Sequence, residues 1–266
     1  MAGLDLTPPL ATVKRGTGEP DRSAGRGPLR IVTLSLVGLL GCAILWISVP
    51  QSVAAFYKLI GGQSVDLLLL GQPLTPYGAE RVEASRRQAL RWVDDRRSHI
   101  EIGVANLDQA MRLQPGSAQW SARLAAAEQA FDNSLELSVV QPVAWLLVAR
   151  LHSYRSDWDA AAAALAMSLR TAHFIGKDAR ERSIIGLTTW PRLDAETIDR
   201  LMESIAATVE QEPALIARLA ADWALEEEIA ARLVARPDDG ARLWRAFARA
   251  VFDHSGEVLL PLMMQP

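Results

Sequence analysis

The sequence predicts an all-α protein that begins with one membrane-crossing helix and continues as a helical domain. Ala, Leu and Arg dominate the composition, and all three are strong helix formers. Runs of β-branched residues, which a large sheet would need, are scarce. Residues 31–49 form an apolar run that carries no charge. With 266 residues, 50% of them hydrophobic, the chain is long enough for one or two domains with a sizeable core.

Residues 1–29 are predicted to be a disordered cytoplasmic tail. Prolines and glycines lie among charged residues there, and no apolar period develops. The basic residues of this tail would favour anionic lipid headgroups, but we interpret them first as topology signals.

Residues 30–50 are predicted to be a transmembrane helix. An uncharged helix over 31–49 would span about 28 Å, close to the hydrocarbon thickness of a bilayer. The apolar region of a signal peptide is usually shorter, about 7–15 residues. Ser52-Val53-Ala54 nevertheless resembles a signal-peptidase site, so cleavage after Ala54 stays open as an alternative. A buried core helix is the interpretation we favour least, because such helices seldom lack a polar face for so long.

The charges that flank this run predict a single-pass inner-membrane protein with its N-terminus in the cytoplasm. Five basic residues precede the run, and only Lys58 follows it within twenty residues. The C-terminal domain would then lie in the periplasm of a Gram-negative cell. Gly38 and Cys42 form a small-xxx-small pair that would let two helices approach closely. Small residues are common in membrane helices, so we do not favour dimerisation through this face.

Residues 51–75 are expected to be a juxtamembrane connector, in which Gly61-Gly62 ends the preceding helix and Pro50 kinks or ends it earlier. The run Leu67 to Leu70 would either lie on the membrane or dock on the first helix of the domain.

Residues 76–266 are predicted to be a helical domain with short connectors and antiparallel neighbouring helices. Thr75 before Pro76 has the pattern of an N-cap followed by proline at the first helical position. Apolar stripes at helical spacing predict helices over residues 76–96, 99–113, 117–135, from 142 onward, 213–223, 225–233 and 243–251.

One segment resembles a tetratricopeptide repeat, a helix–turn–helix unit of 34 residues. It reads AWLLVARLHSYRSDWDAAAAALAMSLRTA over residues 144–172. The positions that match the large and small residues of the repeat are Trp145, Val148, Ala149, Ala161, Leu165 and Ser168, with Ser156 at the turn. His152 departs from the pattern, because a large aromatic residue is usual there. The resemblance implies helical hairpins that bind other proteins.

A degenerate second match precedes this repeat and extends the resemblance over about residues 97–175. Gly103, Leu107, Ala110 and Pro115 match its second helix and closing proline. Trp120 and Trp145 lie 25 residues apart, so the array would be irregular. The segment ALAMSLRTAHFIGKDARERSIIGLTTWPRLDAETIDRL, residues 164–201, is also similar to small membrane-anchored helical proteins of alphaproteobacteria. Some of those proteins are encoded beside surface-polysaccharide genes, and this similarity implies no site residues.

No pattern in the sequence predicts a catalytic residue, a bound metal or a cofactor. The four histidines lack i, i+4 spacing, no nucleotide-binding loop or nucleophile elbow occurs, and Cys42 is the single cysteine. The domain after the apolar run is mildly acidic, which speaks against nucleic acid as a partner.

Charged clusters are expected to be structural. Acidic clusters occur at Asp94-Asp95, Asp157/Asp159, Glu226–Glu228 and Asp238-Asp239. Paired carboxylates can hydrolyse glycosides, but helix capping and solvation explain these positions better. An arginine cluster comprises Arg86, Arg87, Arg91, Arg96 and Arg97. It could hold an anion, but we expect it to pair with Glu80, Glu83, Asp94 and Asp95.

The tryptophans fall into two predicted classes. Trp120, Trp145, Trp223 and Trp244 lie on apolar stripes and are expected in the core. Trp158 and Trp190 are expected to be exposed.

These observations favour a binding protein rather than an enzyme. The expected function is that of a membrane-tethered periplasmic scaffold or adaptor for unidentified envelope proteins, in envelope polysaccharide assembly or export. The alternative is an envelope enzyme that acts on glycan through an acidic pair, which would require a cleft holding a carboxyl group of raised pKa.

Overall fold

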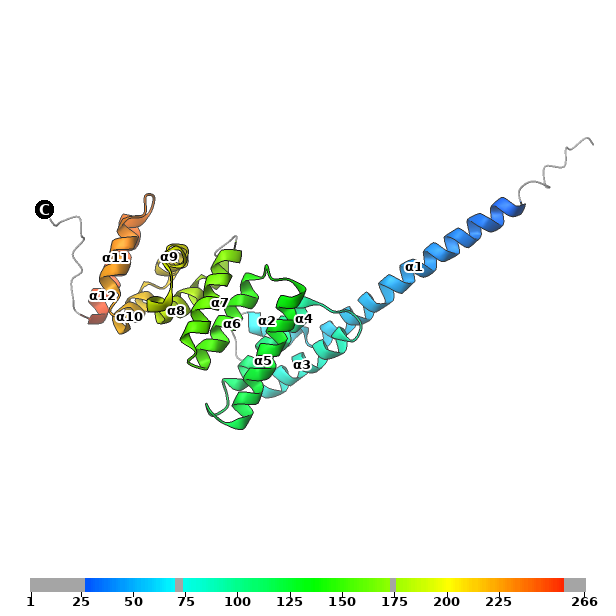
Figure 1. Ribbon diagram of the computed structural model, residues 1–266, viewed down its shortest axis with the longest axis horizontal. Helices are drawn as coiled ribbons and strands as arrows, with labels where there is room; N and C mark the ends of the chain where they lie inside the picture. Colours follow the sequence, from blue (N-terminus) through cyan, green and yellow to red (C-terminus); the bar gives the residue numbers. More distant parts are fainter. Residues whose placement is uncertain (1–26, 70–73, 173–175, 256–266) are drawn as a thin grey trace, which may run out of the picture. The chain divides into compact units, whose positions relative to one another are not determined.

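The computed structural model describes residues 27–69, 74–172 and 176–255, and these residues form helices and connectors without any strand. The predicted all-α fold is therefore confirmed for the described chain (Figure 1). The helices are α1 Gly27–Ile60, α2 Gly62–Leu69, α3 Pro76–Leu90, α4 Arg96–Ala110, α5 Ala118–Leu137, α6 Pro142–Tyr154, α7 Trp158–Thr171, α8 Ala179–Thr189, α9 Ala195–Gln211, α10 Pro213–Asp222, α11 Glu226–Val234 and α12 Gly240–Ser255, with 3-10 turns η1 Gly176–Asp178 and η2 Trp190–Arg192. The predicted tail up to residue 26 lies outside the described residues.

Helix α1 is long and apolar enough to cross a membrane from Val32 to Ile60. The chain divides into two compact units, residues 1–49 and 50–266. Pro50 does not end α1, which continues for ten more residues, whereas Gly61 ends it as predicted. Gly38 has open space around its Cα and Cys42 is exposed.

The last turns of α1 belong to the second unit. Ala54 is buried, and Gly61 lies so close to α3 that an added Cβ would come within 2.6 Å of the Ser85 hydroxyl. Helix α2 then docks through Val65, which shares a small apolar cluster with Leu74 and residues of α3 and α4. Leu67 is partly exposed, and Leu70 lies outside the described residues.

The turn between α3 and α4 comes earlier than the apolar pattern predicts. Thr75 caps α3 as expected, because its hydroxyl accepts a hydrogen bond from the Gly78 amide at 3.0 Å. The helix ends at Leu90 rather than near residue 96. Asp95 is the reason: its carboxylate accepts from the Ser98 amide at 2.9 Å and so begins a new helix. Helix α4 therefore starts three residues before the predicted 99.

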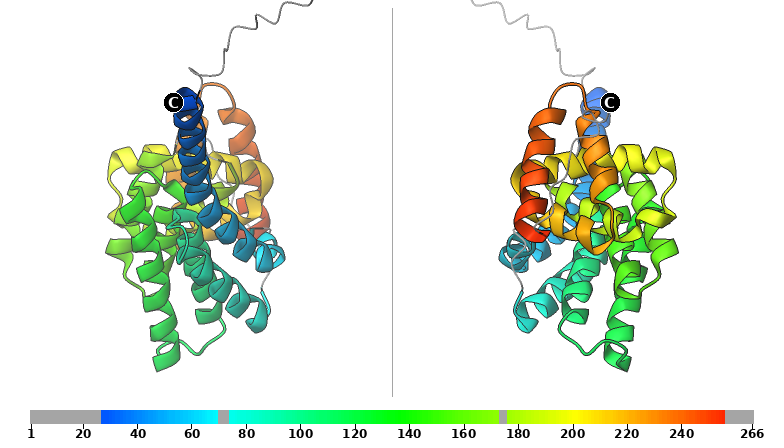
Figure 2. Two further views of the ribbon diagram at one scale, coloured as in Figure 1. Left: turned by 90° about the vertical axis from the view of Figure 1, so that its right-hand side faces the viewer. Right: turned by 90° about the vertical axis from the view of Figure 1, so that its left-hand side faces the viewer.

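Helices α4 and α5 pack closely at a glycine. A Cβ on Gly103 would lie 2.2 Å from the Phe131 ring, so only glycine leaves room for that fully buried ring. Helices α6 and α7 form the predicted hairpin and run side by side (Figure 2). Ala149 and Ala161 are both fully buried between them. Ser156 makes the turn with a left-handed backbone at φ 59°.

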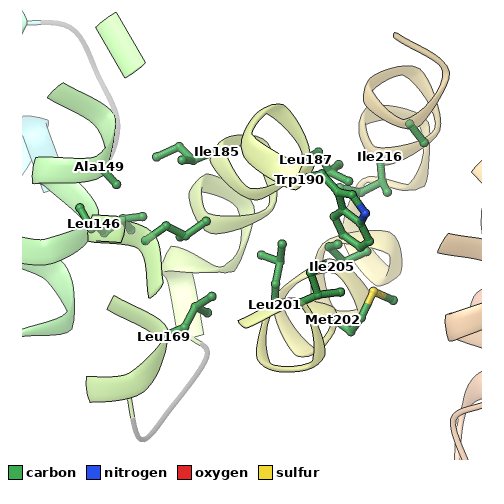
Figure 3. Close-up of a cluster of buried hydrophobic side chains, with 14 of the residues drawn as sticks. Leu146, Ala149, Leu169, Ile185, Leu187, Trp190, Leu201, Met202, Ile205 and Ile216 are labelled. Atoms are coloured by element: carbon green, nitrogen blue, oxygen red, sulfur yellow. The ribbon is translucent and has the colours of Figure 1, made fainter. Parts of the chain in front are cut away.

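A continuous apolar core runs from α4 to α12. Its central part is shown in Figure 3, where Leu201, Met202 and Ile205 of α9 face side chains of α8 and α10. Leu243, Phe247 and Val251 of α12 close this core, as the last apolar stripe predicts.

Two of the tryptophan predictions are wrong, those for Trp190 and Trp223. Trp190 is 5% exposed and lies among core residues such as Leu187 and Ile216 (Figure 3). Its indole nitrogen donates to the Glu228 carboxylate at 3.1 Å, which satisfies the polar edge of the ring and permits burial. Trp223 is 45% exposed. Trp145 is partly buried and packs against the core, and its indole nitrogen donates to the Val139 carbonyl at 2.9 Å.

The Trp223 error is one of helical register. In α10 the fully buried face is made of Ile216, Ala217 and Ala220, while Leu215 and Leu219 are partly buried and Trp223 is exposed. Small residues let neighbouring helices approach closely, so the buried face need not be the one with the largest apolar side chains. Trp120, Trp158 and Trp244 are partly buried.

Candidate functional site

The fold separates the predicted arginine cluster into one buried arginine, which connects helices, and a group of exposed arginines. Arg86 is 3% exposed and forms an ion pair with Glu101 of α4. It also donates to the Lys58 carbonyl at 2.7 Å, one of the acceptors that α1 leaves unpaired at its end. A single guanidinium thus joins α1, α3 and α4. Glu101 was not among the predicted partners, because the pairing crosses from one helix to the next.

The remaining arginines lie near the helix surface. Arg87 pairs with Glu83 at 2.8 Å, one turn earlier on α3, as predicted. Arg97 pairs with Glu101 at 2.8 Å, also one turn apart. Arg91 and Arg96 are exposed. The five arginines therefore do not converge on one anion site.

Asp95 forms a second tie to α1. Its carboxylate accepts from the Lys58 ammonium at 2.8 Å and from the Ser98 backbone and hydroxyl. Burial by itself would raise the pKa of Asp95, but the hydrogen bonds from Lys58 and Ser98 outweigh it and lower the pKa to about 2. The carboxylate therefore stays ionised across the physiological range.

The other acidic clusters are used as caps and ion pairs. Asp157 caps α7 by accepting from the Ala160 amide, and Asp159 pairs with Arg192 at 2.9 Å. Glu228 in the first turn of α11 accepts from Trp190 and Arg232, whose guanidinium also lies 5.9 Å from the Trp190 ring centroid. Asp239 pairs with Arg236 at 2.9 Å.

The described histidines do not form a cluster either. His99 contacts Asp94 at 2.8 Å, and His152 lies 3.6 Å from Asp157. His254 is exposed, and His173 lies outside the described residues. Within the described chain no group of three or more His, Cys, Asp or Glu side chains could hold a metal ion.

A cavity of about 590 Å³, lined by both polar and apolar residues, opens on the α3, α4 and α5 side of the domain. We call it the amide–arginine pocket and define it by Glu83, Arg87, Asn106, Gln109, Arg112 and Arg123. None of these residues except Glu83 and Arg87 was singled out by the sequence patterns. Polar residues on three separate helices converge only once the helices pack.

Hydrogen bonds and ion pairs connect the residues that line this pocket. Asn106 is fully buried; its amide donates to the Ile102 carbonyl at 3.0 Å and its oxygen accepts from Arg123 at 2.9 Å. Arg123 also pairs with Glu83 at 3.1 Å, so α3, α4 and α5 are linked across the cavity. Arg112 is held by Asp108 and donates to the Leu74 carbonyl.

Gln109 supplies the feature that points to a ligand. Its side chain is 9% exposed and lines the pocket, and its amide nitrogen finds no hydrogen-bond partner among the described residues. An unpaired buried donor costs about 1–3 kcal/mol, which an acceptor on a ligand would recover. Three guanidinium groups face one carboxylate in the lining. The pocket therefore suits a ligand that carries carboxylate and carbonyl oxygens, as a peptide segment does.

A second cavity of about 550 Å³ lies between α9 and α11. Four carboxylates line it together with Arg232 and Arg236, and both arginines are already engaged. Arg232 pairs with Asp199 at 2.9 Å, and Arg236 pairs with Glu203 at 2.9 Å. The arginines of both cavities are paired within the chain, but among the described residues only the amide–arginine pocket also holds a buried polar atom without a partner, so the second cavity is the weaker candidate.

One carboxyl group in the described chain has a clearly raised pKa. Asp132 lies on the exposed face of α5, where partial burial and then the neighbouring Glu128 and Glu136 raise its pKa. It lines neither cavity. The raised pKa of Asp132 therefore comes first from its partial burial and then from the two acids on adjacent turns of the same helix.

Comparisons with known proteins identify no family model, no curated protein and no solved structure that matches this chain. The function is therefore argued from the geometry described above.

Proposed function

We propose that this protein is a membrane-tethered scaffold that holds a partner protein in its amide–arginine pocket. The pocket carries the proposal, because the buried Gln109 amide finds no partner among the described residues and the lining holds three guanidinium groups beside a single carboxylate, with Asp108 pairing one of them from outside the lining. A carboxylate with flanking peptide carbonyls would satisfy both. An acidic segment of another protein is the ligand class that fits.

The tether in this proposal is α1. Its residues from Val32 to Val49 are almost all exposed, and the helix continues without a break into the second unit. A hydrophobic surface of that size is stable in lipid and not in water. The five-to-one bias of flanking basic residues favours a cytoplasmic N-terminus and a periplasmic domain.

We further propose that α3 to α7 form an irregular tetratricopeptide-like array. The supporting observations are the α6–α7 hairpin, with Ala149 and Ala161 fully buried at its contact, and the close α4–α5 packing at Gly103. Helical hairpins stacked in this way present extended binding surfaces. A role beside envelope polysaccharide assembly or export rests on the resemblance over residues 164–201 alone.

The glycan-acting alternative required a cleft that holds a carboxyl group of raised pKa. Asp132, the described carboxyl group with such a shift, lies outside both cavities. We therefore put forward the scaffold as the single proposal.

Site-specific photo-crosslinking in intact cells tests the proposal. A photoreactive residue is placed at Ala122, an exposed residue of the pocket lining, and for comparison at Ala163, an exposed alanine of α7 outside the lining. We expect a discrete crosslinked protein from Ala122 and none from Ala163. Equal labelling at both positions, or none at either, would contradict a partner in the pocket.

Gln109→Leu distinguishes binding from folding. The variant removes a buried donor that has no partner, so it should leave the melting temperature unchanged or raise it. Crosslinking from Ala122 should nevertheless fall about tenfold or more, because the ligand loses a hydrogen bond to the amide. Undiminished crosslinking in Gln109→Leu would show that the Gln109 amide does not contact the ligand.

A further inference from the structure

Exposed apolar side chains gather on two neighbouring turns of the second unit. Leu137, Val139, Val140 and Val143 lie on the α5–α6 connection, and they are between 38% and 61% exposed. Trp92, on the α3–α4 turn, is 47% exposed. We call these five residues the apolar rim. A fixed apolar patch of this kind on a domain surface marks a contact with a partner or a membrane.

The valines are held outward by a hydrogen-bonded turn. Gln141 is buried, and its amide donates to the Ser134 carbonyl at 2.7 Å and to the Ser138 carbonyl at 2.8 Å. Trp145 donates to the Val139 carbonyl at 2.9 Å. The backbone of this turn is satisfied from inside the domain, so its apolar side chains have no inward position to take.

Contacts within the second unit connect the two turns to the end of α1. The Ser134 hydroxyl donates to the Arg96 carbonyl at 3.0 Å, which brings the α5–α6 connection to the start of α4. The residue before Arg96 is Asp95, whose carboxylate holds the Lys58 ammonium.

These contacts, all within the second unit, place the rim near Lys58 on the last turns of α1. Lys58 follows Val49 by nine helical residues, a rise of about 14 Å. Arg91 and Arg96 are exposed beside the rim and form no ion pair within the described part of the chain. Arg97 adds a third cation, and the exposed acids of the two turns are Asp94 and Glu136. A tryptophan, aliphatic side chains and an excess of arginine are the composition of a membrane-interface contact.

We propose that the apolar rim rests in the headgroup layer of the membrane that α1 crosses, with Arg91 and Arg96 against anionic lipid phosphates. The proposal relies on the membrane tether of the proposed function. Helix α4 begins at Arg96 beside the rim and reaches Gln109 thirteen residues later, about 20 Å along its axis, so the rim and the amide–arginine pocket lie at opposite ends of α4 within the second unit.

The test uses the full chain in vesicles of phosphatidylcholine and phosphatidylglycerol. In a Cys42→Ser background, single cysteines at Val139 and Val140 carry an environment-sensitive fluorophore. The matched control is Met111→Cys, an exposed apolar position just past the far end of α4. Lipids with a spin label on the headgroup should quench the dyes at Val139 and Val140 about twofold or more relative to the dye at Met111. Introducing Asp at Leu137 and Val143 should reduce that quenching, because these side chains are exposed and their replacement leaves the core intact.

The experiment gives different results if the rim proposal is wrong and if the membrane tether is wrong. A dye at Leu45→Cys, on the exposed surface of α1, should be quenched by spin labels placed deep in the acyl chains. Strong quenching at Leu45 with equal, weak quenching at Val139 and Met111 would overturn the rim proposal and leave the tether in place. No quenching at Leu45 would overturn the tether. A dye at Val139 that is shielded from water without lipid quenching would identify a second copy or a protein on the rim and also overturn the proposal.

Discussion

The two ends of the helical domain are stabilised by different kinds of contact. In α3 to α5, with the end of α1, buried polar groups join the helices: Arg86 to Glu101 and Lys58, Asn106 to Arg123, and Asp95 to Lys58. In α8 to α12 the core is mainly apolar, with Leu201 and Ile205 at its centre (Figure 3). Polar contacts between these helices, such as the Arg232–Asp199 pair, lie mostly at the surface, although Arg182 of α8 is buried. Hydrogen bonds and ion pairs are directional and therefore fix how neighbouring helices are oriented, whereas apolar packing supplies most of the free energy of folding. The candidate binding pocket lies at the polar end, where donors can be held in place for a ligand.

Trp190→Ala should give the largest loss of stability. The variant empties a core site and leaves Glu228 without the indole donor, so the free energy of unfolding should fall by about 3–5 kcal/mol. Trp223→Ala is the matched control; at 45% exposure it should change stability by about 1 kcal/mol or less. Denaturant unfolding followed by circular dichroism measures both. Equal losses would mean that the assigned register of α8 and α10 is wrong.

Arg86→Ala tests the polar end in the same way. It leaves Glu101 buried without its main cation and should cost about 3 kcal/mol or more. The neighbouring Arg87→Ala removes only a surface pair and should cost about 0.5 kcal/mol or less. The double variant Arg86→Met with Glu101→Leu should recover most of the loss, since no buried charge remains. A double variant as unstable as Arg86→Ala would show that the Lys58 carbonyl contact dominates instead.

Gly103→Ala should have an intermediate effect. The added methyl group would lie against the Phe131 ring, and overpacking of this kind costs about 1–3 kcal/mol. Combining it with Phe131→Leu should cost less than the sum of the two single changes, because the smaller side chain makes room. Additive losses would argue against direct contact between the two positions.

The Lys58–Asp95 tie should give the smallest effect, and one that depends on pH. The pKa of Asp95 is lowered to about 2 from 3.8, so its contribution to stability is complete above about pH 4 and is lost as the pH falls toward 2. Asp95→Asn keeps a capping side chain but cannot ionise. The stability difference between the protein and this variant should therefore shrink between pH 4 and 2. Lys58→Met should abolish most of that pH dependence, and a difference independent of pH would contradict the ion pair.

The sequence predicts the helices well because caps and prolines act locally. Thr75 with Pro76 begins α3, Pro142 begins α6 and Gly61 ends α1, all as expected. The sequence did not predict correctly which face of a helix is turned toward the core. Apolar size placed Trp223 in the core and left Trp190 outside, yet a hydrogen bond to Glu228, 38 residues away, decides the position of Trp190.

The candidate site could not be predicted, because its parts come from three helices. Glu83, Asn106 and Arg123 are ordinary surface types in the sequence and carry no motif. They meet only through the packing of α3, α4 and α5, which depends on contacts such as that between Gly103 and Phe131. The one local signal available was Asn106. It is a polar residue on the same inward face of α4 as Ile102 and Gly103.

A pair of reporter fusions after Pro266 tests the central claim most directly. Alkaline phosphatase is active only outside the cytoplasm, and a cytoplasmic fluorescent protein is active only inside it. The account predicts an active phosphatase and a dark fluorescent fusion, with the full-length chain retained in membranes through an alkaline wash. A bright fluorescent fusion with inactive phosphatase would put the helical domain in the cytoplasm and contradict the account. A mature N-terminus at Ala55 would show instead that the chain is cut after Ala54 and has no tether.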